Sequence, residues 1–225
     1  MNKILPILIL LLFLNNNSIF AQDENYKYII NSQSLLGYTG NIVTVSPYIT
    51  DYKKFSFGLH RFNVGVNYGF SKNIEAGISL DLNELSPITN DTFENKTSTI
   101  AAFHIKYNVL RQGYDEQPFD FSFGTHRKTL YFVCGRQFDT LFNSVIGSGV
   151  DINFSSQDKI SYFMSFSFPA KYSSVIIDYK SSMGQVNFGL RSLLSEDVKL
   201  DLFLTDVQNV KNVFNNFVFG LTLTN

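Results

Sequence analysis

NIEAGISLDL, residues 73–82, alternates strictly between two kinds of side chain. Apolar residues fall on one side of the stretch, at Ile74, Ala76, Ile78, Leu80 and Leu82. Polar or small residues fall on the other side, at Glu75, Gly77, Ser79 and Asp81. Because successive side chains of a β-strand point to opposite faces, this stretch predicts a strand with one apolar and one polar face.

The same period of two recurs almost to the end of the chain. The alternating segments are 55–59, 64–70, 74–82, 101–109, 119–123, 130–138, 146–154, 160–168, 175–179, 186–190, 198–204 and 217–223. Short turns or polar loops separate them, and no window shows a capped amphipathic helix. We therefore predict an all-β protein, an antiparallel barrel of about 12 strands with 10–14 in range, formed by one domain over residues 22–225.

The first 21 residues have the layout of a secretory signal peptide. Lys3 supplies a basic start, residues 4–14 form an apolar run, and Ile19-Phe20-Ala21 precede Gln22. The apolar run is too short to cross a bilayer as a helix, which needs about 20 residues. We therefore expect cleavage after Ala21 and export of the mature domain from the cytoplasm.

Alternating strands fit two kinds of barrel. A soluble, lipocalin-like barrel turns its apolar face inward, whereas a membrane barrel turns that face to lipid and its small or polar face to the lumen. The polar faces here carry Gly, Ser and Asn, and only 16% of all residues are charged. Aromatic residues mark the strand ends where a membrane barrel places its girdles, at Phe70, Tyr107, Phe154, Phe168, Tyr172 and Tyr179. These features favour a transmembrane barrel in a Gram-negative outer membrane, with lipid as a partner.

Composition excludes several other classes. A formal net charge of −1 is unsuited to nucleic acid, which needs a basic face. Cys134 is the only cysteine, so no disulfide framework forms within the chain. No histidines and cysteines have the spacing of zinc ligands, and no serine, histidine and acid have a specific catalytic spacing. We expect no metal, no cofactor, no enzymatic activity and, most simply, a monomer.

Loop lengths predict an orientation. Residues 83–97 and 111–118 form the longer polar connections, and 71–73, 169–171, 181–183 and 194–196 form short ones. Long loops of outer-membrane barrels face outward and short turns face the periplasm. We therefore expect the two long loops at the outer end and the four short turns at the inner end.

Residues 35–82 carry the most motif-like pattern in the chain. It comprises an opening at Gly37, Thr39, Gly40, Ile42, Thr44 and Pro47, a strand that contains Gly58 and His60, and a hairpin with Tyr68, Gly69, Glu75 and Gly77. This pattern resembles the start of the YjbH-like, exopolysaccharide-associated outer-membrane barrels and their uncharacterised relatives. The resemblance implies an outer-membrane barrel linked to surface polysaccharide, and it covers about a fifth of the chain.

Charged residues on the polar faces are the candidates for a functional site in the lumen. They are Glu75, Asp81, His104, Lys106, Asp151, Arg191, Lys199 and Asp201. One hypothesis is a charged pore wall for passage of a small solute or export of a polysaccharide. The alternative is a set of ion pairs that plugs a narrow lumen, in a barrel with a structural or surface role. A soluble secreted binder of an apolar ligand is the third hypothesis.

Overall fold

The computed structural model describes residues 29–82, 101–114, 116–141, 143–155, 159–170, 172–210 and 216–225. The predicted signal peptide lies outside these residues. Twelve strands occur in the described part: β1 (Phe55–His60), β2 (Asn63–Gly69), β3 (Ile74–Asp81), β4 (Ala101–Leu110), β5 (Asp120–His126), β6 (Thr129–Phe138), β7 (Ser144–Asn153), β8 (Ile160–Ala170), β9 (Ser173–Lys180), β10 (Gln185–Ser195), β11 (Val198–Leu204) and β12 (Phe217–Thr224). Two short 3-10 helices, η3 (Asp139–Leu141) and η4 (Val207–Asn209), join strands.

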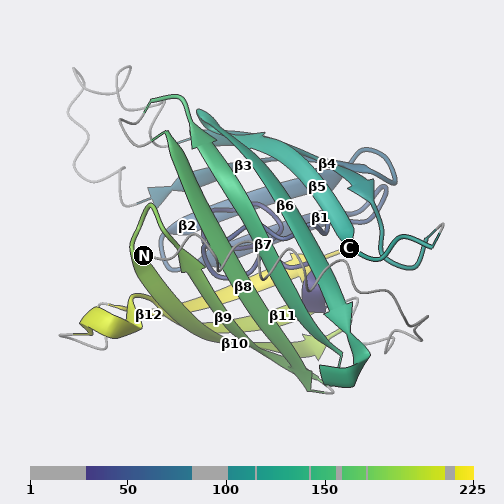
Figure 1. The fold of residues 1–225 in the computed structure, drawn as a ribbon. Coiled ribbons are helices and arrows are strands. Elements are labelled where there is room, and N and C mark those ends of the chain that lie inside the picture. Colours follow the sequence, from purple (N-terminus) through teal and green to yellow (C-terminus); the bar gives the residue numbers. More distant parts are fainter. Residues whose placement is uncertain are drawn as a thin grey trace.

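Each strand pairs antiparallel with its neighbours in the chain, and β1 closes the barrel against β12 (Figure 1). The closing register runs from Ser56 opposite Thr224 to His60 opposite Gly220. Closure leaves no strand edge with unpaired backbone groups. The predicted all-β barrel of twelve strands is confirmed. Over the residues described, no helix is both long and apolar enough to span a bilayer.

The apolar face of the barrel points outward. Along β4, Phe103 and Ile105 are 71% and 57% exposed, whereas His104 and Lys106 between them are 2% and 0% exposed. β1 follows the same alternation, with its aromatic and leucine side chains exposed and its serine and histidine buried. A soluble barrel needs the opposite arrangement, because its apolar face must leave water. The faces are therefore inverted, as the glycine-rich and serine-rich stripes predict.

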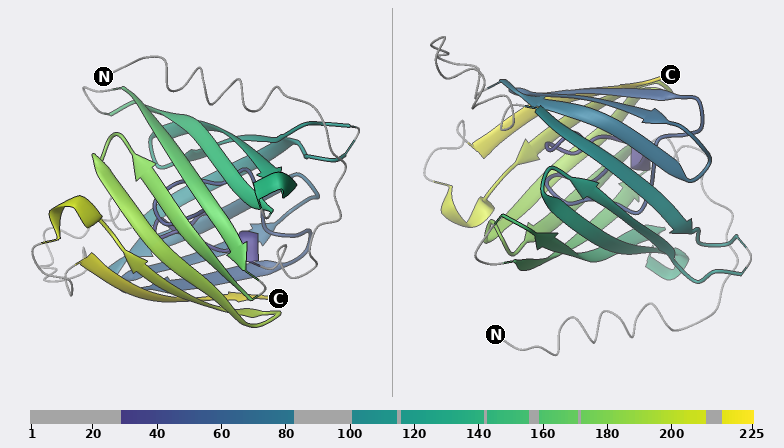
Figure 2. Two further views of the ribbon diagram at one scale, coloured as in Figure 1. Left: turned by 60° about the horizontal axis from the view of Figure 1, so that its bottom comes forward. Right: turned by 90° about the horizontal axis from the view of Figure 1, so that it is seen from above.

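The lumen is filled by the chain's own residues 29–54, which we call the plug (Figures 1 and 2). The plug folds on itself through backbone hydrogen bonds, among them Leu35 N–H to Ile42 O at 2.8 Å and Gly40 N–H to Ser32 O at 2.9 Å. It then continues directly into β1. The period-two pattern gives no indication of this segment, because the plug has no regular strand.

Two apolar clusters join the plug to the inner wall. Leu35, Ile42 and Val43 pack with Ile176, Phe203 and Val218 in the first cluster. Tyr38 and Val45 pack with Tyr131, Val133 and Phe163 in the second. The buried apolar side chains of the inner wall thus gather at two places where it touches the plug, and their burial from water contributes to holding the plug in place.

The alternation of strand direction separates the loops into two ends. The terminal end holds the start of β1 and the finish of β12, and the β4–β5 connection around residues 111–118 lies there. The finish of β3 and the start of β4 are at the opposite end, and residues 83–97 between them lie outside the described residues. The prediction that both long loops share one end is therefore wrong. The short turn at 181–183 is likewise at the opposite end, because it joins β9 to β10, whereas the other three short turns are at the terminal end.

The aromatic residues predicted at strand ends fall into two groups. Phe70, Tyr107, Phe168 and Tyr172 lie toward the terminal end, and Phe154 and Tyr179 lie toward the opposite end. Phe154 is 68% exposed and Phe70 is 59% exposed on the outside of the barrel. Amphipathic rings at these two levels suit the two interfaces of a bilayer.

Replacing Ile105→Lys in the middle of β4 tests whether this outer face meets lipid. A lysine at the centre of the hydrocarbon layer costs about 2–4 kcal/mol, and one near the interface costs about 0–1 kcal/mol. We therefore expect Ile105→Lys to lower the free energy of unfolding in lipid vesicles much more than Val109→Lys, near the end of the same strand. Urea titration, followed by the gel mobility of the folded form, measures both. Equal, small effects would contradict a lipid-facing position.

Candidate functional site: the plugged lumen

The predicted charged residues are distributed in groups around the plug. Seven of the eight are buried, and Asp81, at the end of β3, is half-buried. Glu75, His104 and Lys106 come together on β3 and β4. Arg191 and Asp201 pair across β10 and β11, and Asp151 pairs with Lys180 at 2.7 Å. Lys199 donates to the Thr224 hydroxyl at 3.1 Å.

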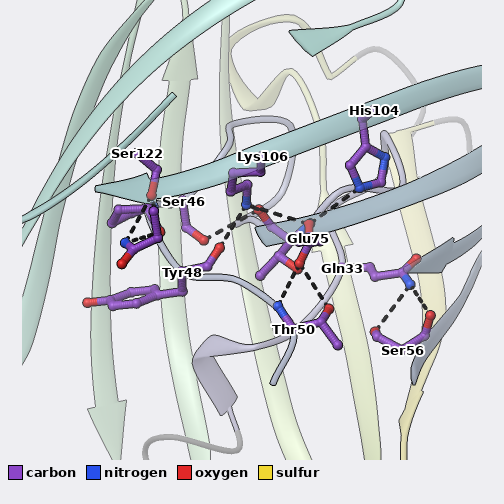
Figure 3. A network of polar contacts seen from close by, with 12 residues as sticks. Gln33, Ser46, Tyr48, Thr50, Ser56, Glu75, His104, Lys106 and Ser122 are labelled. Carbon is purple, nitrogen blue, oxygen red and sulfur yellow. Dashed lines mark hydrogen bonds and ion pairs between the residues drawn. The ribbon is translucent and has the colours of Figure 1, made fainter. Parts of the chain in front are cut away.

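Glu75 accepts hydrogen bonds from two separate parts of the plug (Figure 3). The Thr50 amide and hydroxyl donate to its Oε2 at 2.6 and 2.9 Å, and the Thr39 hydroxyl donates to the same oxygen. The Thr39 amide donates to Oε1 at 3.3 Å. His104 Nε2 lies 3.3 Å from Oε1 and Lys106 Nζ lies 3.8 Å from it. The buried carboxylate thus accepts hydrogen bonds from Thr39 and Thr50 and has a lysine and a histidine within 4 Å, which together compensate its charge.

Lys106 also forms hydrogen bonds directly with the plug. Its Nζ donates to the carbonyl oxygens of Thr39 and Tyr48 at 2.6 and 2.8 Å. Figure 3 shows the lysine and Glu75 close together, with Tyr48 and Thr50 of the plug beside them. A wall cation and a wall anion therefore bind carbonyl and amide groups in the same two parts of the plug, at Thr39 and at residues 48–50.

Arg191 and Asp201 form a second group, on β10 and β11. Arg191 Nε donates to Asp201 Oδ1 at 2.7 Å, and His60 Nε2 lies 2.7 Å from Asp201 Oδ2. The two terminal nitrogens of Arg191 donate to the carbonyls of Gly40 at 3.1 Å and Gln33 at 2.8 Å. The planar fork of an arginine suits this simultaneous contact with several oxygens.

Asp178 on β9 is a plug anchor that the sequence prediction missed. Its Oδ2 accepts the consecutive amides of Ile42, Val43 and Thr44 at 3.0, 2.8 and 3.1 Å. The Thr44 hydroxyl adds a fourth bond at 3.0 Å, and Asn187 Nδ2 donates to Oδ1 at 2.8 Å. Consecutive backbone amides that converge on one anion form a nest. The nest here holds the plug to the wall opposite Glu75.

Uncharged side chains and glycines complete the fit. The Gln33 amide donates to Ser56 O at 2.7 Å, and Ser122 and Asn108 both donate to Pro47 O, at 2.5 and 3.1 Å. Where the plug approaches most closely, the wall carries glycine. A Cβ at Gly65 would lie 2.9 Å from the Gly37 Cα, so a larger residue there would displace the plug.

Tyr38 of the plug packs against two histidines of the wall, His104 on β4 and His126 on β5. Its ring meets the rings of His126 and His104 edge-on, with centroids 5.1 and 6.3 Å away. Its hydroxyl donates to Val43 O at 3.1 Å. Burial raises the pKa of the Tyr38 phenol well above its ordinary value, so the hydroxyl remains a donor across the physiological range.

Several side chains of the wall that face the plug are inaccessible to water. Ser56, Glu75, Lys106 and Asp201 each have an exposed fraction of 0% although they face the lumen of the barrel. Side chains that line a water-filled channel would remain accessible. The arrangement can hold a segment of polypeptide in place, and in this conformation it leaves no aqueous path beside these residues.

The sequence contains a signal for the plug that alternation alone does not use. Phe163, Ile176 and Phe203 occupy polar-face positions of otherwise regular strands. Bulky apolar residues there have no lipid to meet, so they indicate an apolar partner in the lumen. Asp178 also occupies a polar-face position, between Ile177 and Tyr179, so the alternation directs its charge into the lumen.

No group of three or more histidine, cysteine, aspartate or glutamate side chains in the described part of the chain has an arrangement that holds a metal ion. Cys134, on the lipid-facing side of β6 by its register, is half-buried.

No family model matches the chain, and no curated protein matches it. Among solved structures, a triple mutant of the Rhodopseudomonas blastica porin is similar with a TM-score of 0.36 and 12% identity, over 72% of this chain and 55% of the porin. The KdgM porin is similar with a TM-score of 0.43 and 9% identity, over 76% of this chain and 96% of the porin. A complex of KdgM with disordered oligogalacturonate gives 0.43 and 8%. The chain thus spans about half the length of the R. blastica porin, and likeness of this degree assigns no activity. The resemblance to YjbH-like barrels stays a prediction.

Replacing Asp178→Asn tests the nest. The substitution removes the charge that three amides and a hydroxyl share, and a hydrogen bond to a charged group contributes about 1.5–3 kcal/mol. We therefore expect protease in detergent to cleave the plug about tenfold faster or more. Asp151→Asn is the matched control, because it removes the same charge from the same lumen at a carboxylate that pairs with Lys180. Equal cleavage of the two variants would contradict an anchoring role for Asp178.

Proposed function

We propose that this protein is an outer-membrane β-barrel whose pathway for solutes is kept closed by its own N-terminal plug. The observation that carries the proposal is the filled lumen, in which residues 29–54 contact charged side chains of β3, β4, β9 and β10. Passage of a solute then requires that the plug moves. The proposal assigns no reaction to the chain.

The outward apolar face supports a place in a lipid bilayer. Large apolar side chains such as Phe103, Ile105 and Ile160 are more than half exposed around a closed barrel. Closed barrels and helices are the structures that satisfy all backbone groups inside lipid. Together with the predicted signal peptide, this favours the outer membrane of a Gram-negative cell. The longest connection, between β3 and β4, favours an orientation with the opposite end outward and the terminal end toward the periplasm.

The class of solute comes from the resemblance of residues 35–82, which implies surface polysaccharide. Six positions of that pattern, from Gly37 to Pro47, lie in the plug, and Glu75 of its hairpin is a plug anchor. The pattern thus coincides with the closing segment. In the second candidate function, a purely structural or surface barrel, the plug never leaves the lumen, and the dense burial of its anchors favours that candidate.

Deleting residues 29–54 from the otherwise full chain tests the proposal. A lumen of twelve strands without the plug is wide enough to pass ions, so we expect the mean current in planar bilayers to rise roughly tenfold or more over the intact protein. A heat-modifiable shift on a gel shows that the shortened chain still folds. A steady current of equal size from the intact protein would contradict closure by the plug. A folded, shortened barrel without current would contradict a solute pathway.

A further inference from the structure

Two groups of similar composition, each with a carboxylate, a basic side chain and a histidine, lie beside the plug on different parts of the barrel wall. Lys106, Glu75 and His104 form one, and Arg191, Asp201 and His60 form the other. In each, a carboxylate lies within 4 Å of a cation and of a histidine nitrogen, and the cation also donates to plug carbonyls. All six side chains are at most 2% exposed. We call them the β3–β4 triad and the β10–β11 triad, although His60 comes from β1.

The two triads meet at one point of the plug. Lys106 donates to Thr39 O at 2.6 Å, and Arg191 donates to Gly40 O, the next carbonyl, at 3.1 Å. In the order of the barrel, five strands separate β4 from β10 on one side, and β2, β1 and β12 separate β3 from β11 on the other. The triads therefore reach consecutive residues from nearly opposite walls of the lumen.

Most of these contacts are hydrogen bonds to backbone atoms of the plug. The cations take up carbonyl oxygens, and Glu75 accepts the amides of Thr39 and Thr50. Asp201 pairs with Arg191 and His60, so its carboxylate acts on the plug through Arg191. Because two anchored carbonyls adjoin, loss of either cation weakens the same turn. Loss of Lys106 leaves Thr39 O with the longer bonds from the Ser46 amide and hydroxyl at 3.4 Å, and loss of Arg191 removes the charged donor to Gly40 O.

We propose that the two triads act as a double clamp on Thr39-Gly40, and that release of this one turn is the step that opens the lumen. The inference rests on the proposed function and names the device that regulates it. Either triad alone holds the turn only partly, so emptying one triad raises the fraction of time that the barrel is open, and emptying both raises it further.

Neutral pair substitutions in the full chain test the clamp without leaving a lone buried charge. Glu75→Gln with Lys106→Met empties one triad, and Asp201→Asn with Arg191→Met empties the other. We expect each pair to raise the open probability in planar bilayers about tenfold or more, because a hydrogen bond to a charged group is lost. Asp151→Asn with Lys180→Met, a lumen ion pair with no hydrogen bond to Thr39 or Gly40 in the described part of the chain, is the matched control and stays closed.

Arg191→Lys provides a milder variant in case a double substitution does not fold. Lysine keeps the positive charge beside Asp201 but lacks the fork that reaches Gly40 and Gln33 together. We expect a smaller but measurable rise in open probability. A folded Arg191→Lys barrel that stays as closed as the intact protein would overturn the clamp, and so would a control pair that opens as often as the triad pairs.

An engineered disulfide between the plug and the wall tests whether the openings depend on movement of the plug. A Cβ built at Gly58 lies 3.1 Å from the Gln33 Cβ, so a shift of a few tenths of an ångström brings the two into the range of about 3.5–4.5 Å that a disulfide needs. Gln33→Cys with Gly58→Cys, in a Cys134→Ser background, should abolish the openings of a triad variant when oxidised and restore them on reduction. Openings that persist in the oxidised form overturn the clamp. If the plug-deleted barrel conducts but the triad variants stay closed, the result contradicts the clamp and still supports the proposed function.

Discussion

A peptide group buried in a closed barrel must find hydrogen-bond partners inside, and this requirement organises the lumen. The plug brings irregular backbone into a space that water does not reach, and its own turns satisfy only part of it. The wall supplies the missing partners from charged side chains, with Lys106 and Arg191 for carbonyls and Glu75 and Asp178 for amides. Each charge in turn is compensated by a neighbour or by several dipoles, so the buried ions and the buried backbone stabilise one another.

The same requirement explains the composition of the two faces of the wall. Outward positions need only an apolar surface, and Phe, Ile, Leu and Val all occur there. Inward positions have to match a particular neighbour in the plug. Glycine therefore stands at residue 65 against Gly37, and Phe203 stands against Ile42 in an otherwise polar row. The residue types of the inner face are therefore more restricted than those of the outer face.

Sequence periodicity predicts the barrel, its number of strands and its inversion, because a strict period of two leaves each strand little choice of face. It also singles out seven charged residues that the structure buries in the lumen. It does not predict the plug, whose residues 29–54 follow no period and depend on contacts as distant in sequence as Thr44 with Asp178. Loop length misleads at residues 111–118, because the end at which a loop lies depends on strand parity and is independent of length. The period of two does place Asp178 on the polar face, but its role as a plug anchor depends on the distant residues 42–44, which the pattern does not predict.

Closure between β1 and β12 has a consequence for biogenesis. The register joins residues 56–60 to residues 220–224, so the cylinder stays unsealed until the last strand has been synthesised and delivered. Because the segment before β1 is already part of the chain at that moment, it is wrapped by the curling sheet and does not have to thread into a finished ring. The entropic cost of joining such distant ends falls on this final zipping step.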